Sequence, residues 1–309
     1  MPEKTFFQKI IKLLLLFIGF NLVGSFVTLL LLDLLFNIDA ATVLSMISNV
    51  EQLDSSSINA LKFMQMIQVF FSFIVPAHLF ARSEAKNEIS AYFKFNNTKS
   101  LHYVLGLTLI IAVSPLVAYL AEINQSITFP SALSSVENYF RQQQLQNEKL
   151  TAIFLKNNTG ADLFINIFII GILAAMAEEL FFRGVLQKIF IDKVKNIHWA
   201  ILACAVLFSA LHQEFYSLIP RILLGLLLGY AFVYANSIWV PILIHFTNNT
   251  LAVVFDSLYK QGLSSINPNE NEYFGIIGVL ISLILSILLF WYWNKNKSTN
   301  ITYNGARVD

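Results

Sequence analysis

Long apolar stretches, separated by short polar segments, occupy most of the chain. A helix needs about 20 mostly apolar residues to cross the hydrocarbon core of a bilayer. The pattern predicts an all-α, polytopic membrane bundle of about eight transmembrane helices. The fifth and sixth are short, so we expect tilt or stagger there. The stretches cover residues 10–36, 60–81, 101–121, 163–187, 198–213, 217–234, 238–257 and 273–293.

One connection, residues 122–162, is much longer than the others. Its middle part, residues 134–155, is rich in Gln and Glu with spaced apolar side chains. This spacing predicts an amphipathic helix lying on the outer face of the bundle. Such a helix either covers the bundle or contacts a substrate. The spaced apolar residues are Val136, Tyr139, Phe140, Leu145 and Leu150.

Lysine and arginine are concentrated in alternate connections. The connection at residues 37–59 has none, and that at 258–272 has only Lys260. Because cytoplasmic loops are enriched in these residues, the pattern predicts that both chain ends are cytoplasmic. The basic segments carry Lys4, Lys9 and Lys12; Arg82, Lys86, Lys94 and Lys99; Lys188, Lys193 and Lys195; and Lys295, Lys297 and Arg307.

Composition supports a membrane protein. Only 13% of the 309 residues are charged, compared with about 25% in soluble domains. The net charge of +1 gives no indication of a nucleic-acid partner. Cys204 is the only cysteine, so an internal disulfide or a thiolate metal cluster is excluded. Trp291 and Trp293, near the end of the last stretch, are expected to lie at the membrane interface.

The chain divides into three regions. Residues 1–162 form three transmembrane helices and the outer amphipathic segment. Residues 163–257 hold the candidate chemistry. Residues 258–309 form the last transmembrane helix and a polar cytoplasmic tail.

Two adjacent acids interrupt the fourth apolar stretch. Glu178 and Glu179 are followed by Arg183, and ionisable side chains inside a membrane are costly unless they are paired or functional. Glu179 and Arg183 are four residues apart, so they share a helix face and can form an ion pair. Glu178 points about 100° away. We therefore expect Glu179 and Arg183 to support the helix and Glu178 to carry chemistry.

Two of the five histidines lie within apolar stretches that follow the acidic pair. His212 ends the run FSALH, with Phe208 one turn before it. His245 begins the run HFTNN, with Asn249 one turn after it. Asn249 could donate a hydrogen bond to an oxyanion at membrane depth. His102, in contrast, is near a helix end, where we expect it to reach the interface.

One carboxylate and two imidazoles can serve two kinds of chemistry. They can deprotonate a water molecule and direct it at a carbonyl. Alternatively, Glu178, His212 and His245 could hold zinc, since two His and one Glu form a known ligand set. The sequence has no H-E-x-x-H pair, the usual helical zinc signature.

Three motifs together resemble one family. EELFFR from Glu178, FSALH from Phe208 and HFTNN from His245 match EExxxR, FxxxH and HxxxN in order. These are the motifs of the CAAX-protease and bacteriocin-processing (CPBP) family, also called the abortive-infection family of intramembrane proteases. The run PRILLGLLLGYAF is also similar, with Gly225 and Gly229 in small-xxx-small spacing. The resemblance covers about residues 163–257.

The resemblance implies a glutamate-dependent intramembrane endopeptidase of the type II CAAX prenyl kind. Glu178 and His212 match the pair that activates water, and His245 and Asn249 match the pair that stabilises the oxyanion. Glu179, Arg183 and Phe208 match supporting positions. No cofactor is implied, although the family has also been labelled zinc-dependent.

The expected setting is a bacterial plasma membrane, with a membrane protein or peptide as substrate and the lipid bilayer as the surroundings. We expect a polar chamber among the fourth, fifth and seventh helices that opens towards the cytoplasm. A non-catalytic immunity or scaffold protein of the same fold is the alternative. The sequence leaves open the substrate, its prenylation and the oligomeric state.

Overall fold

The computed structural model describes residues 5–48, 53–85, 88–156, 159–265 and 275–298. Within these ranges the regular secondary structure is helical, with no strand, so the all-α fold is confirmed. Six helices are long and apolar enough to cross a membrane. The chain is thus an integral, multi-pass membrane protein. Most of the predicted tail, residues 299–309, lies outside the described ranges.

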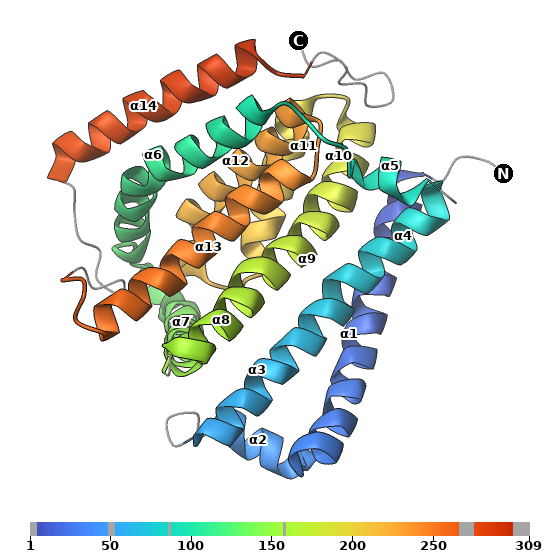
Figure 1. Ribbon diagram of the computed structural model, residues 1–309, viewed down its shortest axis with the longest axis vertical. Coiled ribbons are helices and arrows are strands. Elements are labelled where there is room, and N and C mark those ends of the chain that lie inside the picture. The colour runs from blue at the N-terminus through green and yellow to red at the C-terminus, as the bar shows by residue number, and fades with distance from the viewer. Residues whose placement is uncertain (1–4, 49–52, 86–87, 157–158, 266–274, 299–309) are drawn as a thin grey trace.

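The N-terminal part is a long hairpin joined to a third long helix. Its second arm is continuous through a π-helical segment, and the first arm packs along it (Figure 1). Short α2 and α5 were not predicted, because their sequences lie in connections. The elements are α1 (Phe6–Phe36), α2 (Ala40–Ser48), α3 (Ser55–Val69), η2 (Phe70–Ile74), α4 (Val75–Ala85), α5 (Ile89–Phe93) and α6 (Ser100–Gln125).

The second half contains the predicted amphipathic helix and a compact group of helices. A long rod, built from α8 to α10, runs through the middle of the molecule (Figure 1). The elements are η3 (Ser131–Leu133), α7 (Ser134–Phe154), α8 (Gly160–Asn166), η4 (Ile167–Leu173), α9 (Ala174–Phe181), η5 (Phe182–Leu186), α10 (Gln187–Val194), α11 (Ile197–Ala210), η6 (Phe215–Ser217), α12 (Leu218–Ala235), α13 (Trp239–Lys260) and α14 (Gly275–Lys295).

Each of the eight predicted stretches contains a helix within the described ranges, but two of these helices are not among the six candidate spans. α11 has only 14 residues. α13 has 22 residues but includes His245, Asn248, Asn249 and Asp256, which lower its hydropathy. The count of eight spans and the cytoplasmic position of both ends therefore stay predictions.

The bundle has two distinct ends. At one end, Phe6 of α1 packs against Phe190 of α10, and Ser298 donates to the backbone of Tyr234 in α12. At the other end, α7 covers the chain between α11 and α12. Arg141 of α7 stacks on Tyr216 there, with 4.5 Å from the guanidinium carbon to the ring centre. The start of α1 and the end of α14 thus lie opposite α7 (Figure 1).

The predicted interface positions of Trp293 and His102 are wrong. Trp293 is 1% exposed, and its indole N–H donates to Nδ1 of His102 at 2.8 Å. His102 is fully buried. The end of α14 packs on the start of α6, so the tertiary contact satisfies both polar groups internally. Trp291, on the other face of α14, is 57% exposed, as an interface anchor requires.

Candidate active site

The acidic pair lies on α9, and its second member is fully enclosed. The expected ion pair is confirmed, with 3.0 Å from Nη1 of Arg183 to Oε1 of Glu179. Neither side chain is exposed. Nη2 of Arg183 donates to the carbonyl of Gly225 in α12. The guanidinium also lies 4.8 Å from the ring centre of Phe208 in α11. Arg183 therefore joins α9, α11 and α12.

Close packing of α11 and α12 makes these contacts possible. A Cβ on Gly225 would lie 3.0 Å from the Cβ of Ala205, and one on Gly229 would lie 2.6 Å from Cγ2 of Ile201. Small residues therefore let the two backbones approach, as the small-xxx-small spacing predicts. Gln187, one turn beyond Arg183, donates to the carbonyl of Gly229. Arg183 and Gln187 thus tie this face of the site to the backbone of α12.

His245 on α13 lies between the two acids. Its Nδ1 is 2.8 Å from Oε1 of Glu179, and its Nε2 is 3.8 Å from Oε2 of Glu178. Sequence reasoning gave Glu179 only Arg183 as a partner and missed this contact. No periodicity could reveal it, because 66 residues separate His245 from Glu179. Glu179 thus orients His245, while Glu178 faces the open side.

His212 follows α11 in a turn rather than inside the helix. Its Nδ1 lies 2.8 Å from the carbonyl oxygen of Phe208. Because a carbonyl only accepts, Nδ1 carries the proton and Nε2 keeps a lone pair. The ring also packs edge-on against Phe208, with centres 5.0 Å apart. The predicted one-turn relationship between Phe208 and His212 is present, and it fixes the imidazole orientation.

Asn249 is held by the π-helical segment η4 of the rod formed by α8 to α10. In η4 the N–H of Ala174 bonds to Ile169 and Gly171, so the carbonyl of Ile170 lacks that partner. Nδ2 of Asn249 donates to Ile170 at 3.0 Å instead. π-helical segments often occur at functional sites. An amide has two N–H donors, so one remains for a ligand.

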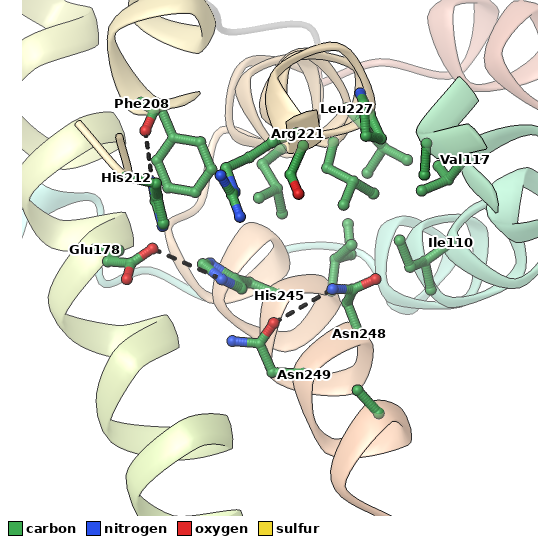
Figure 2. Close-up of a pocket in the computed structure, with 17 residues that line it drawn as sticks. Ile110, Val117, Glu178, Phe208, His212, Arg221, Leu227, His245, Asn248 and Asn249 are labelled. Carbon is green, nitrogen blue, oxygen red and sulfur yellow. Dashed lines mark hydrogen bonds and ion pairs between the residues drawn. The ribbon is translucent and has the colours of Figure 1, made fainter. Parts of the chain in front are cut away.

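These side chains meet around one cavity of about 610 Å³. Glu178, His212, His245 and Asn249 all line it, and Phe208 forms part of its wall (Figure 2). The expected convergence of three distant motifs is confirmed. Glu179 and Arg183 lie behind His245 rather than in the cavity lining. The catalytic role of each residue stays a prediction.

The cavity lies in the half of the bundle nearer α7. Its lining includes Val117 and Ala121 near the end of α6, and Ser217 and Arg221 near the start of α12. We expected cytoplasmic chain ends and a chamber that opens towards the cytoplasm. The two expectations conflict, because the chain ends lie opposite α7 (Figure 1). The basic loops predict which side of the membrane each loop occupies. They carry no information on where the cavity lies along the bundle.

A second, more polar cavity of about 410 Å³ lies under α7. Ser217 lines both cavities. Glu214 lines the second and bonds through Oε2 to Arg221, which lines the first. Asn147 of α7 donates to the other carboxylate oxygen of Glu214. The hydrogen-bonded side chains of Arg221, Glu214 and Asn147 thus lie between the two cavities.

Arg221 and Asn248 also line the first cavity, and sequence reasoning did not assign them to the site. A charged residue in the first turn of an apolar helix is a signal that could have identified Arg221. Asn248 gave no such signal, because Asn occurs commonly in contacts between membrane helices.

Within the described ranges, no group of three His, Cys, Asp or Glu side chains is arranged to hold a metal ion. Glu178 and His245 are neighbours, but Nδ1 of His212 and Nδ1 of His245 are already bonded to protein oxygens. A zinc site would have to use the Nε2 atoms.

Comparison with known proteins agrees with this geometry. Residues 160–251 match the family model described as type II CAAX prenyl endopeptidase Rce1-like. This segment is similar to that family, and we call it the Rce1-like segment. It contains all three motifs and every candidate catalytic residue. The resemblance to CPBP proteins drawn from the motifs is therefore confirmed.

One curated relative of this chain is an uncharacterized 24.3 kDa protein of Escherichia coli. It is 29% identical over 98 residues, which are 30% of this chain and 45% of that protein. The chain thus spans about half the length of this relative. No solved structure matches the chain.

Proposed function

We propose that this chain is an intramembrane endopeptidase that cleaves a peptide bond of a membrane-associated or C-terminally lipidated protein. The observation that carries the proposal is one carboxylate, Glu178, in a cavity with two oriented imidazoles. The Rce1-like segment supports a protease of the CAAX kind. Six apolar helices support a membrane location, for which we propose the bacterial plasma membrane.

Glu178 and His212 are proposed to activate water. His212 offers the lone pair of Nε2, because Nδ1 is committed to Phe208. Glu178 is the part-exposed acid of the pair, with 17% of its side chain accessible, whereas Glu179 is fully enclosed. A proton acceptor must be accessible to the water that it deprotonates, which favours Glu178 over Glu179.

His245 and Asn249 are proposed to stabilise the tetrahedral oxyanion. Nδ1 of His245 donates to the Arg183-paired carboxylate of Glu179, so this role requires a proton on both ring nitrogens. The Glu179 contact holds the ring with Nε2 towards Glu178 and the cavity. Asn249 contributes its second amide N–H. Loss of one oxyanion donor costs about 10²- to 10³-fold in turnover in known hydrolases. The mechanism uses protein side chains and water, with no cofactor.

The test compares membrane proteomes of cells with wild-type chain, Glu178→Gln or His212→Gln. The proposal expects at least one processed terminus that depends on Glu178 and His212. Matched controls are Glu88→Gln and His198→Gln, whose side chains are exposed and outside the cavity. Processing that survives in either cavity variant contradicts the proposed mechanism.

The purified full chain is then tested on the identified substrate, with and without a chelator. Full activity after metal removal supports water activation by Glu178 and His212 alone. Loss of activity, restored by added zinc, would instead assign Glu178, His212 and His245 as metal ligands. If biological activity persists in Glu178→Gln without any processing, the immunity or scaffold alternative is favoured.

A further inference from the structure

Arg221 differs from the other arginine of the site. Arg183 is fully buried outside the cavity lining, with Nη1 bonded to Glu179 and Nη2 to the carbonyl of Gly225, and its Nε has no hydrogen-bond partner within the described ranges. Arg221 lines the cavity, and its Nη2 donates to Glu214. Its Nη1 is buried and has no hydrogen-bond partner within the described ranges. A buried, charged donor left unpaired is unfavourable unless a ligand completes it.

Glu214 contacts Arg221 through one nitrogen only. Its Oε2 accepts from Arg221 and its Oε1 accepts from Asn147 of α7. In this arrangement Nη1 has no acceptor within the described ranges, and the cavity that Arg221 lines is the space beside it in which a ligand can supply one. Figure 2 shows the guanidinium of Arg221 pointing into this space, on the same side as Phe208 and above His245.

Arg221 lies on α12, close along the helix to the residue that contacts the buried Glu179–Arg183 pair. Arg221 precedes Gly225 by one turn of α12, and Gly225 is the residue that Arg183 holds. Four residues of helix correspond to ~6 Å along the axis. Arg221 therefore lies about one turn nearer to α7 than the layer of Glu179 and Arg183, and it lines the same cavity as Glu178.

We propose that Arg221 binds a carboxylate of the substrate close to the scissile bond and is thereby a specificity-determining residue. This inference rests on the proposed peptidase function. A guanidinium matches a carboxylate in a planar, two-bond geometry, which a lysine cannot reproduce. The carboxylate is either the free C-terminus of the substrate or an Asp or Glu side chain.

The experiment uses the purified full chain in lipid nanodiscs and a library of short apolar peptides in three matched sets. The sets carry a free C-terminal acid, a C-terminal amide, or an amide with one internal Glu. Binding is measured on the Glu178→Gln variant, so no cleavage is needed, and cleavage is measured on the Glu178 form by mass spectrometry.

The proposal expects preferential binding and cleavage of one carboxylate-bearing set over the neutral amides. The set that is preferred identifies the source of the carboxylate. Arg221→Gln should raise KM for that set by about 10- to 100-fold, the range of charge-assisted hydrogen bonds, with less effect on kcat. Arg221→Lys should recover only part of this loss.

Two controls separate recognition from structural support. Arg141→Gln removes an arginine that is also paired with a glutamate, Glu137, but lies on α7 outside both cavities. It should keep the preference. Glu214→Gln removes the partner of Arg221, and should retain or strengthen the preference if Arg221 acts through the substrate. If Glu214→Gln and Arg221→Gln lose the preference equally, Arg221 only anchors α7 and the proposal is overturned.

Failure of this inference can be distinguished from failure of the proposed function. Equal binding and cleavage of acids and amides would overturn the role of Arg221 and leave the peptidase in place. Cleavage of no peptide in any set would count against the peptidase. If the Glu178→Gln variant then also binds the acid and amide peptides equally, the role of Arg221 is overturned as well, on evidence that does not depend on cleavage.

Discussion

Nδ1 of His245 lies 2.8 Å from Oε1 of Glu179, and the same oxygen accepts from Arg183 at 3.0 Å. One buried carboxylate thus neutralises the arginine that joins three helices and also orients the imidazole that faces Glu178. The two adjacent acids have separate tasks. Glu179 builds the site, and Glu178 is available for chemistry.

Glu179→Gln should therefore destabilise the protein as well as reduce cleavage. The change leaves Arg183 fully buried without an opposite charge, and breaking such a pair costs about 3–5 kcal/mol. Thermal unfolding of the detergent-purified protein measures the effect. The double variant Glu179→Gln/Arg183→Met should recover much of the stability but not the activity. A wild-type melting curve for Glu179→Gln would contradict this account.

Gly229→Ala should separate α11 from α12. Its Cβ would lie 2.6 Å from Ile201 and 2.9 Å from Oε1 of Gln187, and overpacking of this kind costs about 1–3 kcal/mol. Gly19→Ala on α1 is the matched control, because nothing lies within 4 Å of its Cβ. The control should unfold at or above the wild-type temperature. Equal melting of both variants would show that the glycine contact is unimportant.

Stability should rise with pH because of Lys94, which lies between α5 and α6 and outside the six candidate spans. Burial lowers the pKa of the Lys94 ammonium to about 7 from its usual 10.5. Between these values the unfolded chain binds more protons than the folded chain, so stability increases as pH rises from about 7. The melting temperature should increase from about pH 7 to about pH 9.

Lys94→Met tests this assignment, since it removes the titrating group. The variant should show a flatter dependence of melting temperature on pH than wild type. Lys99→Met, at an exposed position a few residues away, serves as the control and should keep the wild-type slope. An unchanged slope in Lys94→Met would assign the effect to other groups.

Membrane topology can be measured by cysteine labelling, because Cys204 is buried and should not react. Gln146→Cys on α7 and Lys99→Cys at the opposite end are both exposed. The distribution of basic residues predicts that a membrane-impermeant reagent added to intact cells labels Gln146→Cys and not Lys99→Cys. The reverse result would place the chain ends outside and the α7 end in the cytoplasm.

The measurement also places the cavity relative to the two sides of the membrane. The cavity lies in the half of the bundle nearer α7. Labelling of Gln146→Cys from outside would therefore place the cavity in the half of the bundle away from the cytoplasm, whereas we expect the chamber to open towards the cytoplasm.

The sequence by itself determined the helical membrane fold, the amphipathic helix at residues 134–154 and the three motifs of the site. These are local properties, since hydropathy and helical spacing act over a few turns. The Glu179–Arg183 pair was predictable for the same reason.

Only the tertiary structure decided which side chains meet. The contact of Glu179 with His245, the burial of Trp293 against His102 and the position of Arg221 in the cavity each join segments that are distant or differently exposed. Such contacts depend on how the helices pack and on which buried polar groups then need a hydrogen-bond partner. A local sequence pattern contains no information on either.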